Sequence, residues 1–192
     1  MNEKELIDFV GRLSRQPSDI NEHLPTLLEY GRKCETIVEL GVRWPNSTWA
    51  LLASKPKMMK SYDIIDPSHW GSSIQPVIDT AHNIGIDYEF IIANSLEIEI
   101  LDTDLLFIDT LHCYNQLKQE LSLHHRNINK YIIMHDTTSY RIKDEGSIVE
   151  GCTGEGLWLA IEEFLQQNTN WKIKHEYTNN NGLTVLINEN IL

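Results

Sequence analysis

The 192-residue chain falls within the usual size range of one domain, and its 41% hydrophobic and 23% charged residues are ordinary for a soluble globular protein. Its formal net charge of −12 disfavours nucleic acid and anionic membrane surfaces as partners, because both need clustered Lys and Arg. We therefore expect one domain over residues 1–192, with an N-terminal helical segment (1–33) and an α/β core (34–192).

Apolar residues at helical spacing predict two N-terminal helices, one around Leu6, Val10 and Leu13 and one from near Pro25 to Gly31. Strand-like and helix-like runs then alternate. The predicted strands are Thr36–Leu40, Met59–Ile65, Tyr88–Ile92, Leu105–Ile108 and Tyr131–Met134. The predicted helices are Ser47–Ser54, Ser72–Asn83, Tyr114–Arg126 and Leu157–Gln167.

The C-terminal part has a different pattern. Trp171–Tyr177 and Leu183–Ile187 read as strands, and the intervening Asn-Gly sequence predicts a hairpin. Short apolar strands upstream are typical of a parallel sheet covered on both faces. The predicted class is therefore α/β, with a mostly parallel seven-stranded sheet closed by an antiparallel hairpin. Thr137–Gly156 is long and irregular, and we expect it to be a mobile substrate loop.

Cysteine usage and the N-terminus indicate a cytoplasmic protein. Cys34, Cys113 and Cys152 are scattered, without the pairing typical of disulfide frameworks or thiolate zinc sites. The start of the chain has no signal-peptide pattern. No apolar run approaches the roughly 20 residues needed to cross a bilayer.

Polar residues follow the first three predicted strands, where open parallel sheets bind ligands. Glu39, Gly41, Ser47 and Thr48 suit a tight ligand-binding turn, or an ordinary strand–helix turn. Asp63 or Asp66 follows the second strand and can accept hydrogen bonds from a ribose diol; we favour Asp63, since Asp66 also reads as a turn residue. Asn94 and Ser95 follow the third strand and either contact an adenine edge or cap the next segment.

The fourth and fifth predicted strands both end at acids. Asp109 and His112 follow one strand, and His135 and Asp136 end the other. Converging carboxylates repel each other unless a cation or proton lies between them. A divalent metal ion with oxygen ligands would relieve this repulsion. His112, three residues after Asp109, reads either as a general base facing the same cleft or as a surface or hydrogen-bonded histidine.

The motifs ELG…NST, YDIID, ANS, DLLFIDTLHCY and IIMHDT, in this order, resemble class I S-adenosylmethionine-dependent methyltransferases. The branch most similar groups cephalosporin-hydroxylase-like proteins with macrolide-sugar O-methyltransferases. The resemblance extends roughly from Ser18 to Asn188 and includes the closing hairpin.

The resemblance assigns a role to each candidate. It implies that the first-strand loop holds the methionine end of the cofactor, that Asp63 binds ribose, and that Asn94 and Ser95 lie beside adenine. It implies a metal site and a catalytic pair among the later residues: Asp109, His135 and Asp136 for the metal, and His112 with Asp109 for catalysis, with Asp109 also near the cofactor.

Three positions depart from the family pattern. Pro45 replaces the second glycine of the first motif and removes a backbone N–H. Thr110 replaces the glycine after Asp109. His135 replaces the first acid of a metal-binding pair and suits a softer metal or none.

These observations predict S-adenosylmethionine-dependent O-methylation of a sugar or other small-molecule hydroxyl, with Mg²⁺ or another divalent metal as an additional cofactor. A small-molecule or glycan acceptor fits the acidic chain. Trp44, Trp70 and Tyr140 could stack on a sugar, and the alternative for the tryptophans is ordinary packing. The alternatives are a dehydrogenase or other nucleotide-cofactor enzyme, a cofactor-less binding domain of the same fold, and a metal hydrolase. The sequence leaves both a monomer and a homo-oligomer open.

Overall fold

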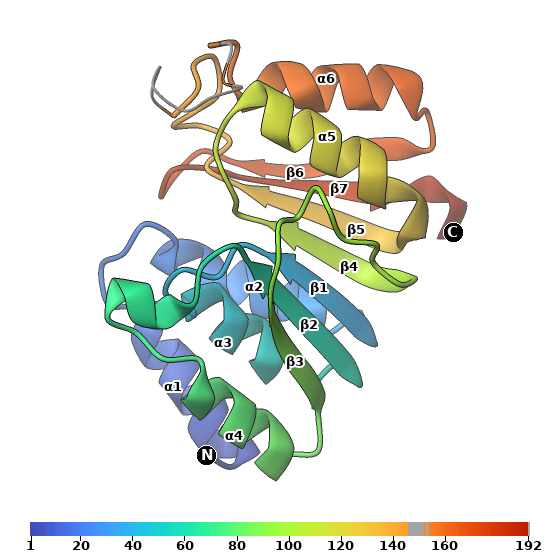
Figure 1. Cartoon of the computed structure of the whole chain (residues 1–192). Coiled ribbons are helices and arrows are strands. Elements are labelled where there is room, and N and C mark those ends of the chain that lie inside the picture. The colour runs from blue at the N-terminus through green and yellow to red at the C-terminus, as the bar shows by residue number, and fades with distance from the viewer. Residues whose placement is uncertain (146–151, 153, 192) are drawn as a thin grey trace.

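The computed structural model describes residues 1–145, 152 and 154–191 (Figure 1). It contains a seven-stranded sheet in the order β3-β2-β1-β4-β5-β7-β6. The strands are β1 Thr36–Leu40, β2 Met58–Asp63, β3 Asp87–Ile92, β4 Thr103–Ile108, β5 Ile128–His135, β6 Trp171–Tyr177 and β7 Leu183–Asn188. Strands β1 to β5 are parallel, and β7 is antiparallel to both β5 and β6. The predicted α/β class with a closing hairpin is confirmed.

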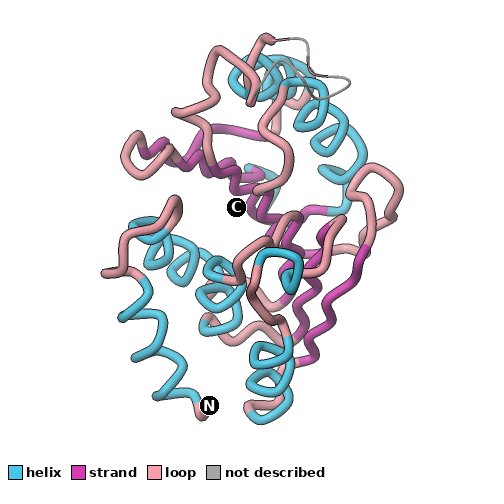
Figure 2. The backbone as a smooth tube through the Cα atoms, turned by 60° about the vertical axis from the view of Figure 1, so that its left-hand side comes forward, coloured by secondary structure: helices cyan, strands magenta, loops and turns pink. Residues whose placement is uncertain are grey.

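Helices cover both faces of this sheet (Figures 1 and 2). They are α1 Glu3–Leu13, α2 Leu24–Gly31, α3 Asn46–Ala53, α4 Gln75–Asn83, α5 Tyr114–His124 and α6 Leu157–Gln167. Helices α1 to α4 pack on one face, and α5 and α6 pack on the other. The predicted N-terminal helices thus contribute to the core of the α/β unit.

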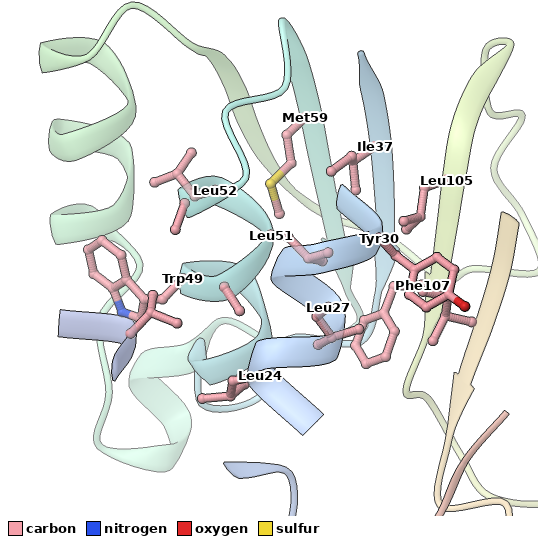
Figure 3. Close-up of a cluster of buried hydrophobic side chains, with 14 of the residues drawn as sticks. Leu24, Leu27, Tyr30, Ile37, Trp49, Leu51, Leu52, Met59, Leu105 and Phe107 are labelled. Atoms are coloured by element: carbon pink, nitrogen blue, oxygen red, sulfur yellow. The ribbon is translucent and has the colours of Figure 1, made fainter. Parts of the chain in front are cut away.

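Alternating side chains of the central strands build the two cores. Ile37, Leu105 and Phe107 join the buried cluster beneath α2 and α3 (Figure 3). Val38 and Leu106 point the other way, toward α5 and α6. All six residues of β4 are buried, as expected for a strand covered on both faces.

Several element boundaries differ from the sequence prediction. Strand β2 ends at Asp63 rather than Ile65, because Asp66 caps a 3-10 turn at Pro67–Trp70 and leaves Ile64 exposed. Helix α4 begins at Gln75 rather than Ser72, with a proline in its first turn. The predicted loop at Thr137–Gly156 lies partly outside the described residues, at 146–151 and 153.

Within the part of the chain that the structure describes, none of the helices has the length and apolar character needed to cross a membrane.

Candidate active site

The carboxyl ends of β1 to β5 open into two adjacent cavities. The first, the Asp63 cavity, has a volume of about 420 Å³ and lies beyond β2 and β3. The second, the Asp136 cavity, has a volume of about 530 Å³ and lies beyond β4 and β5. The two cavities share five lining residues: Arg43, Trp70, Asp109, Thr110 and Leu111. Both volumes are typical of small-molecule sites.

The turn after β1 depends on Gly41. Its φ is +88°, and the turn carries the chain directly past the backbone carbonyl of Asp109. The next two N–H groups, from Val42 and Arg43, donate to Asp63 Oδ2 at 2.8 and 2.9 Å. Asp63 therefore holds this turn while also lining the first cavity.

Asp63 keeps limited capacity for a further donor. Its Oδ1 also accepts a hydrogen bond from the Ile65 N–H at 3.0 Å. Three N–H groups thus occupy three of the roughly four acceptor sites of a carboxylate. Asp66, the alternative ribose acid, accepts from the Ser68 N–H and acts as the turn cap.

Glu39 lies behind the cavities rather than in them. It is fully buried, and its two oxygens accept hydrogen bonds from Ser47 Oγ at 2.7 Å and Ser61 Oγ at 2.6 Å. Burial raises the pKa of Glu39 to about 7, although the serine hydrogen bonds oppose the rise. Ser47 lines the Asp136 cavity. Thr48 is fully buried and lines neither cavity. Glu39 can therefore act on a ligand only through Ser47.

The predicted adenine pair lines the Asp63 cavity, but its side chains bond elsewhere. Asn94 accepts from the Leu96 N–H at 3.0 Å and donates to Glu97 at 3.1 Å, so it caps its own turn. Ser95 Oγ donates to the buried Glu120 of α5 at 2.6 Å.

Four residues from β4, β5 and their loops meet in the Asp136 cavity or at its floor. His112 Nε2 lies 3.2 Å from Asp109 Oδ1 and 3.0 Å from Asp136 Oδ2. His135 Nδ1 lies 3.3 and 3.2 Å from the same two oxygens. The other His112 nitrogen, Nδ1, lies 2.8 Å from Glu145 Oε2. The two strand-end acids therefore converge as predicted, with both histidines bridging them.

These contacts determine the proton state of the rings. Burial disfavours the charged form of His112, but its hydrogen bonds to Asp109, Asp136 and Glu145 outweigh burial and raise its pKa to about 12. For His135 the same two aspartates overcome burial and raise the pKa to about 10. An imidazole with these partners keeps its proton. The role of His112 as a general base therefore stays a prediction, and it requires that one of these carboxylates no longer contacts the ring.

The same residues fit a divalent cation. One ligand atom each from Asp109, His112 and Asp136 lies within 4.8 Å of the other two. Asp136 Oδ1 is buried without a hydrogen-bond partner among the described residues. His112 completes this group where the sequence indicated His135, whose Nε2 faces the backbone oxygen of Asn180 at 3.2 Å. Mixed imidazole and carboxylate ligands suit Zn²⁺, Mn²⁺ or Fe²⁺ better than Mg²⁺.

Aromatic rings form walls of the Asp136 cavity. Trp44 and Trp70 both line it and are 42% and 43% exposed. The Trp44 indole N–H donates to the Trp70 carbonyl at 3.2 Å, and the Arg43 guanidinium lies 4.2 Å from the Trp44 ring centre. Tyr140 does not line the cavity but stacks on His112, with ring centres 4.8 Å apart.

Two cysteines that are distant in the sequence meet beside this site. Cys113, Cys152 and a carboxylate oxygen of Asp144 lie within 4.8 Å of one another. The Asp144 carboxylate accepts three backbone N–H groups, from Tyr114, Gly154 and Gly156. Their sequence spacing gave no indication of this group. Sequence reasoning also missed Arg43, Gln116, Glu120 and Glu145, which carry no motif of their own.

Comparisons with known proteins identify the fold. No protein-family model matches the sequence, and no curated protein matches it. The chain is similar to a putative caffeoyl-CoA O-methyltransferase from Staphylococcus aureus, with a TM-score of 0.66, 13% identity, and 97% of this chain and 98% of that chain covered. For an O-methyltransferase from Bacillus cereus in complex with S-adenosylhomocysteine, the TM-score is 0.60 and the identity 11%, with 96% of this chain and 89% of that chain covered. For a methyltransferase from Podospora anserina, also bound to S-adenosylhomocysteine, the TM-score is 0.59 and the identity 13%, with 94% of this chain and 86% of that chain covered.

These likenesses, all below 25% identity, show the fold. The chain has the fold of class I S-adenosylmethionine-dependent methyltransferases, as its motifs indicated. The sugar-methylating branch stays a prediction.

Proposed function

We propose that this protein transfers a methyl group from S-adenosylmethionine to a hydroxyl oxygen of a sugar or another small molecule. One observation carries the proposal. Two cavities of ligand size meet at Asp109, one bordered by a strand-end acid and the other by a cluster of carboxylates and imidazoles. A nucleoside donor in one cavity and an acceptor in the other would face each other across this residue.

The Asp63 cavity suits the nucleoside. Asp63 lies at the carboxyl end of β2, where this class of sheet binds ribose, and it retains one acceptor site. Gly41 lines this cavity, and its tight turn packs the end of β1 against the backbone carbonyl of Asp109. Ser47, held by Glu39, faces the neighbouring cavity, where the methionine end of the cofactor would lie.

The Asp136 cavity suits the acceptor. Trp44 and Trp70 line it, and the Trp44 indole N–H donates to the backbone carbonyl of Trp70, which fixes the Trp44 ring. Indole faces stack on the apolar faces of sugars and on planar rings. The acids at the cavity floor disfavour an acceptor whose reacting end is anionic.

Asp109, His112 and Asp136 are the residues that would hold a divalent cation. Such an ion would orient an acceptor hydroxyl and lower its pKa. Holding both substrates in line can supply roughly 7–11 kcal/mol of the barrier reduction. The chain's own contribution is therefore mainly the relative position of the two cavities.

Titration calorimetry with S-adenosylhomocysteine tests the donor site, with NAD as the matched comparison. We expect S-adenosylhomocysteine to bind and NAD not to bind. The reverse would favour a dehydrogenase, and no binding of S-adenosylhomocysteine at millimolar concentration would favour a cofactor-less binding domain.

The transfer reaction is tested with methyl-labelled S-adenosylmethionine and a panel of sugars, phenols and amines, after chelator treatment and after adding back Mn²⁺, Zn²⁺ or Mg²⁺. We expect label on a hydroxyl oxygen, with Mn²⁺ or Zn²⁺ more effective than Mg²⁺. Trp44→Ala should raise the KM for the acceptor without changing donor affinity, because Trp44 lines the Asp136 cavity and not the Asp63 cavity. Label transferred to nitrogen acceptors alone would contradict the proposal.

A further inference from the structure

A buried carboxylate in α5 organises one end of the Asp63 cavity. Glu120 is fully buried. Its oxygens accept hydrogen bonds from Ser95 Oγ at 2.6 Å, from Thr110 Oγ1 at 2.8 and 2.9 Å, and from the side-chain amide of Gln116 at 2.8 Å. All three donors belong to residues that line the cavity.

This network determines which way the Gln116 amide points. Its nitrogen, Nε2, donates to Glu120 Oε1 and also to Ser95 Oγ at 3.0 Å. The Ser95 hydroxyl donates its one hydrogen bond to Glu120, so toward Gln116 it can only act as an acceptor. An amide rotated by 180° would place its oxygen against two acceptors. The amide oxygen, Oε1, is therefore directed away from Glu120, and it has no hydrogen-bond partner among the described residues.

The other polar side chains at this end have no such free atom. Both polar atoms of the Asn94 amide are bonded within the turn that follows β3. Ser95 Oγ both donates to Glu120 and accepts from Gln116. Of these three side chains, Gln116 alone keeps an unused acceptor beside the cavity.

We propose that Gln116 Oε1 accepts a hydrogen bond from the exocyclic 6-amino group of the adenine ring and thereby selects adenine over 6-oxo purines. The inference rests on the proposed function, because it assumes that the Asp63 cavity holds the nucleoside. A 6-oxo purine would place a carbonyl oxygen against the amide oxygen, and two acceptors repel. Glu120 is then a positioning residue, since it acts on the ligand only by orienting Gln116.

The test compares S-adenosylhomocysteine with S-inosylhomocysteine, the analogue in which an oxygen replaces the 6-amino group. Calorimetry on the wild-type protein should give at least about tenfold tighter binding of the adenine compound. Gln116→Met keeps the side-chain length and removes the amide. We expect it to weaken S-adenosylhomocysteine about tenfold and to leave S-inosylhomocysteine within about threefold. Gln119→Met, an exposed position on the same helix, should preserve the wild-type ratio.

A second variant tests the positioning role. Glu120→Gln supplies a donor where a carboxylate stood, so the Gln116 amide loses its fixed orientation. We expect the ratio of the two affinities to fall in this variant, with a cooperative thermal transition showing that it is folded. A folded Glu120→Gln protein with the wild-type ratio would remove Glu120 from the role.

The outcomes separate the two proposals. If the wild-type protein binds neither nucleoside, the proposed function fails and this inference fails with it. If it binds S-adenosylhomocysteine but Gln116→Met keeps the full preference for adenine, only this inference is overturned.

Discussion

Gly41 lies against the backbone carbonyl of Asp109, so that a Cβ atom on Gly41 would be 2.0 Å from the Asp109 oxygen. The contact joins the ends of β1 and β4, the two strands at the centre of the site. It is reinforced by the Asp109 N–H, which donates to the Leu40 carbonyl at 2.8 Å. The backbone of Asp109, and with it the boundary between the two cavities, is therefore positioned by the absence of a side chain at residue 41.

Gly41→Ala is expected to lower the free energy of unfolding by roughly 3 kcal/mol, because it combines a positive φ with a steric clash against backbone. Gly85→Ala is the matched control, since Gly85 has a φ of +75° but open space around it. The control should cost only about 1 kcal/mol. Urea unfolding of both variants measures the difference, and equal costs would contradict the close contact.

Asp63→Asn should weaken S-adenosylhomocysteine at least about tenfold, because the carboxylate both holds the turn after β1 and faces the cavity. The Asn side chain has only one accepting oxygen, so it cannot accept hydrogen bonds from the turn and from the ligand with both of its terminal atoms. Asp66→Asn serves as the control, since that carboxylate caps the 3-10 turn instead, and its affinity should stay within about threefold. Calorimetry distinguishes the two, and a larger loss at Asp66 would reverse the assignment.

Glu39→Gln should change the pH dependence of stability. The folded-state pKa of Glu39, about 7, lies above the ordinary value of 4.5, so folding is penalised by up to about 3 kcal/mol as pH rises from 4.5 to 7. Gln cannot ionise, so this loss of stability should disappear in the variant. Urea unfolding at pH 5, 6, 7 and 8 measures it.

The same variant tests whether Glu39 contacts the cofactor. Because Glu39 lies behind Ser47, Glu39→Gln should leave the affinity for S-adenosylhomocysteine within about threefold. A tenfold loss in a protein of wild-type stability would show that the carboxylate contacts the ligand after all.

The chelator-treated protein should lose stability at both pH extremes. The pKa values of His135 and His112 are raised, to about 10 and about 12, so their stabilisation is complete below about 6.5 and is lost as pH rises toward 10. The pKa values of Asp109 and Asp136 are lowered, because the two imidazolium rings outweigh burial. Their stabilisation is present above about 3.9 and is lost as pH falls below it.

Asp136→Asn should reduce the loss of stability at both low and high pH, since it removes one partner of each imidazole ring. Urea unfolding in EDTA between pH 3 and 10 measures this effect. Asp102→Asn, at an exposed position just before β4, is the control for removing a carboxylate. A variant with the wild-type pH profile would show that the cluster does not hold these protons.

Much of the fold follows from local pattern. Strand β1, helix α6 and strand β6 have the predicted bounds, because apolar periodicity and flanking turn residues act over only a few positions. The strand after Lys57 ends two residues earlier than predicted, since Ile64 and Ile65 look like strand residues and only the Asp66 cap shows that the chain has already turned.

The candidate site was predictable in outline and not in detail. Asp109 and Asp136 were expected to converge, because parallel strands bring their carboxyl ends to one edge. Which nitrogen faces which oxygen was not predictable, and neither was the replacement of His135 by His112 in the three-ligand group. Glu120 and Gln116 lie in an ordinary amphipathic helix, where nothing in the local sequence separates them from surface residues.

The sequence by itself determined the order of the elements and the kind of side chain at the end of each strand, because both depend on neighbours within a few positions. Only the tertiary structure decided which of those side chains keep a free atom for a ligand. Their hydrogen-bond partners come from distant segments, 25 residues away for Ser95 and Glu120 and 45 for His135 and Asn180, and these pairings exist only once the chain has packed.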